Sequence, residues 1–407
     1  MLVAVESGGP TGGAERVAFD TVRVLSEAGI PVVIISSASK VDEAFASLPN
    51  VTTEALDLEI QHNRFFHGGK KHMLLNLMED RAMKERFEQV LGKYDSPNTI
   101  YHAHGFHNFF TQASLHVATS LAMKTLVTAH DFGIACPNAM QFNYETSEIC
   151  PILPLSIACA RTACMGGPAN RLKQLRFARN WASHKLHHVP QKLDRLLAVS
   201  EYEKSILAKQ LGPKVRLGLL NNPVDPASDS RQNPAASKNH IWIGRMTDEK
   251  DGLTPAQACA DLNLPITFVG DGPNRHEIES ANPKAVIAGW QEPEQVKDFQ
   301  RKARVMILAS RCYETASLVV LECLAAGIPC IVPEVSAATS WVEDGFNGLY
   351  FKAGDKDSLK AALTKLQDDD LVETMSQHAF DRYWSAPFTI GRYRNELLQI
   401  YSEALSQ

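Results

Sequence analysis

Short apolar segments alternate with helical segments along the chain in two successive series, and this alternation limits the fold more than any other feature. The first series of apolar segments covers 2–6, 32–36, 100–103, 125–129 and 196–199. The second series covers 240–243, 266–269, 286–288, 305–308 and 330–332. Short continuous apolar runs are typical of strands that are buried on both faces. Because strands that alternate with helices form parallel sheets, the sequence predicts an α/β protein with two doubly wound sheets.

Two sheets indicate two domains, and a chain of 407 residues can bury a core in each. The segment 225–238 is rich in Pro, Ser, Asp and Asn and lacks periodicity, which predicts a linker. We therefore expect an N-terminal domain over 1–224 and a second domain over 239–385. The remaining residues, 386–407, include a helical pattern over 390–405.

Charge and composition exclude several classes of protein. The formal net charge of −5 gives no support for a nucleic-acid partner. The first residues predict a strand followed by glycines rather than a signal peptide. The best apolar run is interrupted by Glu322, Gly327 and Pro329, so we expect no membrane span. Eight cysteines in a chain of this length do not make a disulfide scaffold, which predicts a protein of the reducing cytoplasm.

One segment of the second half combines two carboxylates with the start of a helix. Residues 314–322 read Glu-Thr-Ala-Ser-Leu-Val-Val-Leu-Glu, and a glycine and a further apolar run follow. This pattern predicts a loop, a buried helix, a glycine stop and a buried strand. Glu314 precedes the helix, where backbone amides favour anions, and Glu322 lies within it, where an unpaired carboxylate is costly. The segment therefore suits a phosphorylated sugar or a nucleotide, whose hydroxyls would donate to the carboxylates.

This segment resembles the E-x7-E signature of retaining glycosyltransferases with the GT-B fold, in the large family 4-like group of bacterial polysaccharide and glycolipid transferases. Further motifs with the order and spacing of that family cover nearly the whole chain. They are the glycine-rich stretch 8–16 and the segments 127–131, 198–201, 220–225, 243–245, 249–252 and 269–273. Two departures occur. Residues 315–317 are Thr-Ala-Ser where the family commonly has Pro-Phe-Gly, and residues 249–252 are Glu-Lys-Asp-Gly where it has Glu-Lys-Gly.

The resemblance implies a GT-B architecture, in which two doubly wound domains face a cleft and the last helix returns to the first domain. It implies transfer of a hexosyl-type sugar from a nucleoside diphosphate sugar to a saccharide or glycolipid acceptor, with retention of the anomeric configuration. The donor site is expected in the second domain and the acceptor site mainly in the first. The alternatives are a nucleotide-sugar epimerase of the same fold and a non-catalytic protein that binds sugar nucleotides.

The resemblance also implies which residues form the site. The catalytic set is Glu314, His130, Arg245 and Lys250. The donor-binding set is Glu322, Gly12, Gly13, Ala316, Ser317 and Leu318. The matching Arg and Lys of the family hold the donor diphosphate, whose negative charge grows as the glycosidic bond breaks. His130 ends a predicted strand and matches a family histidine that contacts the donor sugar near the reacting centre.

The glycine-rich stretch 8–16 has a second interpretation, because a strand, glycines and a helix also begin a dinucleotide-binding fold. That fold expects a carboxylate at the end of the second strand, and the segment 35–39 has none. The sequence also lacks the Gly-Lys-Ser/Thr of a phosphate-loop NTPase. We therefore expect the bare backbone at Gly12 and Gly13 to approach the donor phosphate or the acceptor.

Acidic and histidine-rich segments do not predict a metal at the active site. No Asp-x-Asp motif lies convincingly at a strand end, since 355–357 and 368–370 are typical of helix ends. We therefore expect no metal and no cofactor, with the diphosphate neutralised by Arg245, Lys250 and helix amides. The histidines at 102, 104 and 107 flank a strand end and suit a metal by their spacing, but they lack paired carboxylates.

Four cysteines lie within one irregular segment, and they leave two interpretations. These are Cys136, Cys150, Cys159 and Cys164. Four thiols can hold a structural zinc, but the usual C-x2-C spacing is missing. Buried free thiols are therefore the expectation, with zinc as the alternative.

The segment 149–193 contains no Asp or Glu, and its cations are Arg161, Arg171, Lys173, Arg176, Arg179, Lys185 and Lys192. Its middle part has the pattern of an amphipathic helix with Leu175 and Trp181 on the apolar side. An ordinary surface helix is one interpretation. In a chain of negative net charge, the segment 171–192 also suggests contact with an anionic membrane surface or a lipid-pyrophosphate acceptor. We therefore expect a cytoplasmic protein that is peripheral at the inner face of the membrane.

Overall fold

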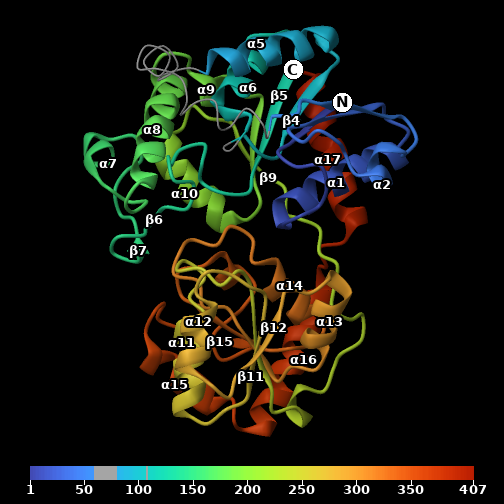
Figure 1. The fold of residues 1–407 in the computed structure, drawn as a ribbon. Coiled ribbons are helices and arrows are strands. Elements are labelled where there is room, and N and C mark those ends of the chain that lie inside the picture. The colour runs from blue at the N-terminus through green and yellow to red at the C-terminus, as the bar shows by residue number, and fades with distance from the viewer. Residues whose placement is uncertain (59–79, 107–108) are drawn as a thin grey trace. The chain divides into compact units, whose positions relative to one another are not determined.

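The computed structural model describes residues 1–58, 80–106 and 109–407, which form two compact units (Figure 1). Unit 1 comprises Met1–Gln141, Pro151–Pro223 and Ile390–Gln407, and unit 2 comprises Phe142–Cys150 and Val224–Thr389. In this part of the chain no helix is both long and apolar enough to cross a membrane.

Unit 1 is built on a seven-stranded sheet in the order β3-β2-β1-β4-β5-β8-β9, in which all neighbours pair in parallel. Its strands are β1 (Leu2–Val5), β2 (Val32–Ser36), β3 (Val51–Ala55), β4 (Ile100–Ala103), β5 (Lys124–Ala129), β8 (Arg195–Ala198) and β9 (Leu217–Leu219). The central strands β1 and β4 are buried at every residue. Helices on both faces of the sheet account for this burial and for the continuous apolar runs.

Helices of unit 1 connect and cover these strands. They are α1 (Gly13–Glu27), α2 (Glu43–Ala46), α5 (Arg81–Leu91), α6 (Thr111–Ala118), α7 (Ile157–Arg161), α8 (Ala169–Lys185), α9 (Val189–Lys192), α10 (Glu201–Leu211) and α17 (Ile390–Leu405), with a 3-10 turn η1 (Gly92–Tyr94). Although α17 is the end of the chain, Tyr393, Leu397 and Tyr401 belong to the same core as Val17 and Phe19 of α1. Figure 1 shows α17 beside α1. The last helix therefore returns to the first unit, as the resemblance implied.

Unit 2 is built on a six-stranded parallel sheet in the order β12-β11-β10-β13-β14-β15. Its strands are β10 (His240–Ile243), β11 (Ile266–Val269), β12 (Val286–Gly289), β13 (Val305–Ile307), β14 (Cys330–Pro333) and β15 (Gly348–Phe351). Its helices are α11 (Leu253–Asp261), α12 (Arg275–Ala281), α13 (Pro293–Arg301), α14 (Leu318–Ala325), α15 (Lys356–Lys365) and α16 (Asp369–Ser385), with η2 (Pro234–Ala236) and η3 (Ala337–Ser340). An antiparallel hairpin of β6 (Phe142–Asn143) and β7 (Glu148–Ile149) is also assigned to this unit.

The core of unit 2 lies in two layers, one on each face of its sheet. Trp242 packs in one layer with Phe268 and Ile307, whereas the preceding Ile241 packs in the other layer with Met306. Successive side chains of a strand point to opposite faces, so β10 contributes to both layers. Two parallel sheets with helices on both faces confirm the predicted fold class of two doubly wound domains.

The basic segment 171–192 folds as α8 and α9, but two of its cations are internal. Lys173 is fully buried, and its ammonium donates to backbone carbonyls at the end of α7. Arg179 is buried and forms an ion pair with Asp80 at 3.2 Å. Their long apolar stems allow these side chains to lie inside. The expectation that Lys173 and Arg179 face a membrane is therefore wrong, whereas Arg171 and Lys185 are exposed.

Candidate functional site

The carboxyl ends of β10 and β13 meet at one edge of the unit 2 sheet, because these strands are parallel neighbours. The loop after β10 carries Arg245 and Lys250, and the loop after β13 carries Glu314. The loop after β11 packs against the loop after β10 at Gly270, whose φ is +134°. A Cβ at Gly270 would lie 1.9 Å from the carbonyl oxygen of Gly244, so only glycine permits this approach.

Lys250 and Glu314 form a close ion pair at this edge. The distance from Nζ to Oε1 is 2.6 Å, and the hydroxyl of Ser310 donates to the same carboxylate oxygen. Burial lowers the pKa of Lys250, but the Glu314 carboxylate outweighs this effect and raises the pKa above its usual value. Burial raises the pKa of Glu314, but Lys250 and Ser310 hold it below its usual range. Both groups are therefore charged at neutral pH.

Arg245 presents its guanidinium at the surface of the same edge. Its side chain is 67% exposed, and Nη2 lies 3.8 Å from Oε1 of Glu249, which is a long ion pair. The charge of Arg245 also helps to lower the pKa of Glu314, after the larger effects of Lys250 and Ser310. The structure thus places Arg245, Lys250 and Glu314 at one edge of the unit 2 sheet, and their roles stay predictions.

Helix α14 begins at this edge, directly after the loop that leaves β13, and the amides of Leu318 and Val319 precede its first backbone hydrogen bond, from Val320 to the carbonyl of Ser317. Its N-cap is Ser317, and Ala316 and Leu318 on either side are partly exposed. Ser317 has φ +46°, a conformation that costs a residue other than glycine roughly 1 kcal/mol. The family commonly has glycine here. Asp251, the extra residue of the Glu-Lys-Asp-Gly stretch, also has positive φ, at +48°.

Glu322 lies apart from the ion pair, as the fifth residue of α14. It is 9% exposed, and its Oε2 accepts a hydrogen bond of 2.8 Å from the Nε2 of Gln300 on α13. This hydrogen bond offsets part of the cost of burying the carboxylate. The two glutamates of the E-x7-E segment therefore have different surroundings, one paired with a cation and one with an amide.

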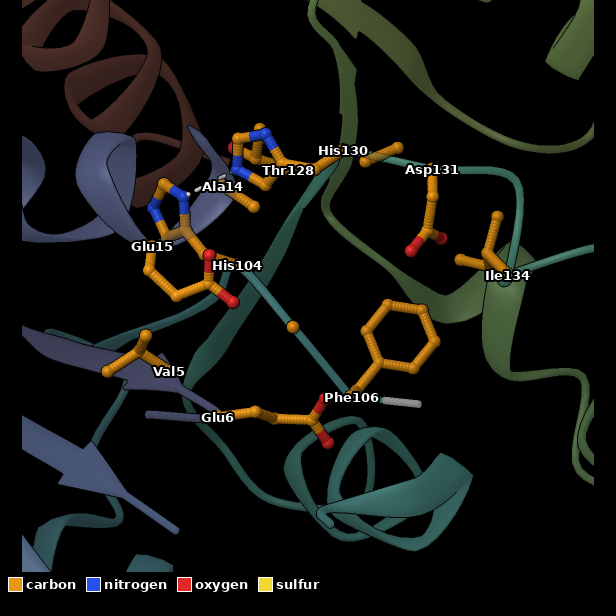
Figure 2. A pocket seen from close by; sticks show the side chains of 12 residues that line it. Val5, Glu6, Ala14, Glu15, His104, Phe106, Thr128, His130, Asp131 and Ile134 are labelled. Carbon is orange, nitrogen blue, oxygen red and sulfur yellow. Dashed lines mark hydrogen bonds between the residues drawn. The ribbon is translucent and has the colours of Figure 1, made fainter. Parts of the chain in front are cut away.

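Unit 1 contains a cavity of about 90 Å³ at the carboxyl ends of its central strands β1, β4 and β5 (Figure 2). The polar side chains that line it are those of Glu6, Glu15, His104, Thr128, His130 and Asp131. Gly12 and Gly13 are exposed at the start of α1, directly before two lining residues. Gly12, Gly13 and His130, which the sequence also suggested as site residues, therefore lie near one cavity.

His104 and His130 line this cavity, the ring of His102 packs against that of His104, and burial keeps all three neutral. Nδ1 of His104 is 3.1 Å from Nε2 of His130, and Figure 2 shows the two rings facing one another. Burial lowers the pKa of His130 to about 4, and the charge of Asp131 opposes this only in part. Burial also lowers the pKa of His102 to about 3 and that of His104 well below its usual value.

Carboxylates that sequence reasoning did not assign to the site also line the cavity. Glu6 accepts hydrogen bonds from the amides of Phe109 and Phe110 at 2.7 and 2.8 Å, at the start of α6. Glu15 and Asp131 are the other two acids of the lining. Glu6 and Asp131, like Ser310 in unit 2, stand within a few residues of the end of a buried parallel strand, and this position was the available signal. Carboxylates accept hydrogen bonds from hydroxyls and repel anions, so the cavity suits a neutral saccharide.

The buried histidines make stability depend on pH. In the unfolded chain each imidazole binds a proton below about pH 6.5, whereas in the folded chain it does so only near or below pH 4. The unfolded state therefore binds more protons, and the free energy of unfolding should fall between pH 6.5 and 4. Each such histidine contributes up to about 1.4 kcal/mol per pH unit.

We expect His102→Gln to reduce this slope by up to about 1.4 kcal/mol per pH unit in urea denaturation of the full chain. The exposed His276 offers a matched control, because His276→Gln removes an imidazole that is not buried. Equal slopes for the His102 variant and the unmodified protein would contradict this electrostatic description.

The residues considered for metal binding have other partners. His102 bonds the hydroxyls of Tyr401 and Thr128 through its two ring nitrogens, and His107 lies outside the described residues. All eight cysteines are free thiols. Asn138 links two of the four that were considered for zinc, accepting from Cys136 Sγ at 3.1 Å and donating to Cys164 Sγ at 3.4 Å. Across 1–58, 80–106 and 109–407, no group of three or more His, Cys, Asp or Glu is arranged to hold a metal.

Two family models match the chain. Residues 11–228 match the family described as Glycosyltransferase Family 4, and residues 237–369 match the one described as Glycosyl transferases group 1. The first match alone covers more than half of the chain.

Curated relatives of the chain are named as glycosyltransferases. A GDP-mannose-dependent alpha-mannosyltransferase of Corynebacterium glutamicum is 26% identical over 216 residues, which are 51% of this chain and 49% of the relative. The UDP-Gal:alpha-D-GlcNAc-diphosphoundecaprenol alpha-1,3-galactosyltransferase of Escherichia coli is 24% identical over 234 residues, which are 51% and 59% of the two chains. The matches thus span 49% and 59% of the length of these two relatives.

Solved structures with the same fold align with all or nearly all of this chain. Sucrose-phosphate synthase from Thermosynechococcus elongatus has a TM-score of 0.71 at 16% identity and covers 100% of this chain and 98% of its own. Anabaena HepE in complex with UDP has a TM-score of 0.64 at 16% identity and covers 99% of both chains. At these identities the likeness shows the fold, which is the GT-B fold.

Proposed function

Since the chain belongs to glycosyltransferase family 4, we propose that it transfers a hexosyl-type sugar from a nucleoside diphosphate sugar to a saccharide or glycolipid acceptor. We propose further that the anomeric configuration is retained. The donor would bind at the carboxyl edge of the unit 2 sheet and the acceptor at the cavity of unit 1.

The observation that carries the proposal is the set of charges at the edge of unit 2. An exposed guanidinium of Arg245, an ammonium of Lys250 and the first amides of α14 all lie there. These are the groups that bind phosphate oxygens, through charge and through unpaired N–H donors. Glu314 orients Lys250 and takes one of its three N–H donors. A diphosphate that gains charge in the transition state is therefore stabilised more than the bound donor is.

The proposed reaction proceeds on one face of the sugar. The bond from the anomeric carbon to the phosphate oxygen breaks, and the acceptor hydroxyl oxygen forms its bond from the same side. The proton of that hydroxyl passes to the leaving phosphate, so no protein nucleophile is required. The anomeric carbon carries positive charge during this exchange.

A panel of donors tests the reaction class. The named relatives use GDP-mannose and UDP-galactose, so the panel begins with these two and with UDP-glucose. Release of nucleoside diphosphate should require an acceptor from a membrane lipid or polysaccharide extract. Conversion of the donor sugar without an acceptor would indicate an epimerase, and binding without turnover would indicate a non-catalytic protein.

Because Arg245, Lys250 and α14 are proposed to neutralise the diphosphate, a chelator should leave the rate unchanged, and a strict need for a divalent metal would contradict that proposal.

Glu322 is proposed to accept hydrogen bonds from the donor ribose. Replacing it with alanine would leave those hydroxyls without their partner, so we expect donor binding to weaken by about 1–3 kcal/mol. Isothermal titration of the nucleoside diphosphate measures this difference. Gln300→Ala serves as the control, because it removes one internal partner of Glu322 and leaves the carboxylate in place. Unchanged affinity in a folded Glu322→Ala protein would rule out this role.

Contact with an anionic membrane is proposed for the exposed part of the basic segment only. Its exposed cations are Arg171, Lys185 and Lys192, and the apolar side chains of Ile157 and Leu186, which lie within 149–193, are 73% and 54% exposed. Each cation near an anionic surface adds about 1 kcal/mol of attraction, which salt screens. We expect co-sedimentation with anionic but not neutral liposomes, and loss of binding at high salt or when the three cations are changed to Gln. Equal, negligible binding to both liposomes would leave a soluble acceptor as the proposal.

A further inference from the structure

A chain of buried hydrogen-bonding groups runs through unit 1 from the C-terminal helix to His130. The Tyr393 hydroxyl of α17 lies 2.7 Å from Oγ1 of Thr21 on α1. Oγ1 of Thr21 lies 3.3 Å from Nε2 of His104, and Nδ1 of His104 lies 3.1 Å from Nε2 of His130. Thr21, His104 and Tyr393 are all at most 4% exposed. Hydrogen bonds this far from solvent hold their direction, because water does not replace either partner.

The direction of the chain is set at Thr21. A threonine hydroxyl has one hydrogen, and Oγ1 of Thr21 lies 2.9 Å from the carbonyl oxygen of Val17, one helical turn earlier. A carbonyl oxygen can only accept, so the hydroxyl hydrogen is donated to Val17. Oγ1 then accepts from the Tyr393 hydroxyl and from the Nε2–H of His104. The distances agree, since the contact of Thr21 with Val17 is shorter than its contact with His104.

The direction of donation that is set at Thr21 also fixes the hydrogen bond between the imidazoles of His104 and His130. A neutral imidazole carries one N–H, and both rings are neutral because burial lowers their pKa values. When Nε2 of His104 carries the hydrogen, its Nδ1 is an acceptor. The hydrogen between the rings therefore belongs to Nε2 of His130. Nδ1 of His130 carries none and acts only as an acceptor.

We propose that Thr21, acting through His104, holds His130 in the Nε2–H tautomer, so that a hydroxyl of the donor sugar can bind at Nδ1 only by donating its hydrogen. The identity of that ligand as a sugar rests on the proposed function, but the tautomer does not. A hydroxyl that donates gains electron density on its oxygen, which stabilises the positive charge that develops at the anomeric carbon. Thr21 and His104 are positioning residues, because they reach the sugar only through His130.

A second chain in the same core provides a matched control. Nδ1 of His102 lies 2.7 Å from the hydroxyl of Tyr401, which is also on α17. Nε2 of His102 lies 2.8 Å from Oγ1 of Thr128. None of these hydrogen bonds includes His104 or His130. Tyr401→Phe therefore changes a buried tyrosine of the same helix without removing a hydrogen bond of the proposed relay.

The tautomer is observable without any substrate. In the full-length protein labelled with 15N-histidine, a long-range 1H–15N correlation spectrum at pH 7 reports which nitrogen of each ring carries hydrogen. His130→Gln identifies the signals of this residue among the 14 histidines. We expect protonated Nε2 and unprotonated Nδ1 at both His104 and His130. The opposite pattern at His130 in the unmodified protein would overturn the proposal without reference to any variant or to the proposed function.

Variants at Thr21 test the cause. Thr21→Val keeps the shape of the side chain but removes the acceptor oxygen, so His104 and His130 should lose their single tautomer. Thr21→Ser keeps the oxygen and should retain that tautomer in both rings. Tyr401→Phe should change the signals of His102 only. With an active donor and acceptor, Thr21→Val should lower kcat about tenfold with little change in KM, and Thr21→Ser should restore it. A His130 spectrum that is unchanged in a folded Thr21→Val protein would show that Thr21 does not set the tautomer.

Discussion

Replacing Lys250 with methionine is expected to lower kcat at least about a hundredfold. The side chain keeps its length but loses the charge that is proposed to face the leaving diphosphate, and removal of one such preorganised group typically costs two to three orders of magnitude in rate. The expected loss is larger in kcat than in donor affinity, because the phosphate charge grows only as the glycosidic bond breaks. Initial rates of nucleoside diphosphate release over a range of donor concentrations separate the two quantities.

Lys360 offers a matched control on the same unit. It is a partly exposed lysine of α15 that pairs with Asp261 at 3.1 Å. Asp261 is the last residue of α11, and helices in this fold run back from the carboxyl edge of the sheet, so this pair lies away from the proposed donor site. Lys360→Met should leave kcat unchanged. Full activity of the Lys250→Met protein would mean that the ion pair with Glu314 serves the fold alone.

Replacing Glu314 with alanine is expected to lower the free energy of unfolding by about 3 kcal/mol, because it leaves the ammonium of Lys250 largely buried without its partner. The hydroxyl of Ser310 loses its acceptor in the same step. Replacing both members of the pair, as in Lys250→Met combined with Glu314→Leu, should recover most of this stability, since no uncompensated charge remains.

Urea denaturation and activity together distinguish structure from function at this pair. The double variant should be stable and inactive, whereas Glu314→Ala should be both less stable and inactive. A loss of stability below about 0.5 kcal/mol in Glu314→Ala would contradict the buried ion pair as described. Activity in the stable double variant would contradict the role of these charges in the reaction.

Nine of the ten strands that sequence patterns predicted have a neighbour on each side, and the tenth, β12, is an edge strand. Four predicted segments, 32–36, 100–103, 240–243 and 266–269, coincide with β2, β4, β10 and β11, and the other six differ from the observed strands by one residue at one or both ends. The strands β3, β9 and β15 were not predicted, and each forms an edge of its sheet. Edge strands are covered less completely, and β3 reads Val-Thr-Thr-Glu-Ala without a continuous apolar run.

The site was predictable where residues follow one another along the chain, and less so where distant segments meet. Arg245, Lys250 and Glu314 each follow a buried strand, and adjacent parallel strands bring them to one edge. The contact of Tyr393 with Thr21 joins residues 372 positions apart, and no local pattern marks it. The burial of Lys173 could not be predicted either, because its partners are backbone carbonyls, which any sequence provides.

The product of the reaction tests the central claim most directly. With the donor that the panel selects, the reaction is followed by NMR, and the one-bond coupling between C1 and H1 of the transferred sugar gives its anomeric configuration. Nucleoside diphosphate sugars of this panel carry an α-linked hexose. We predict an α-linked product that forms only when both donor and acceptor are present. A β-linked product would contradict retention, and a changed or released sugar without any transfer would contradict the assignment as a glycosyltransferase.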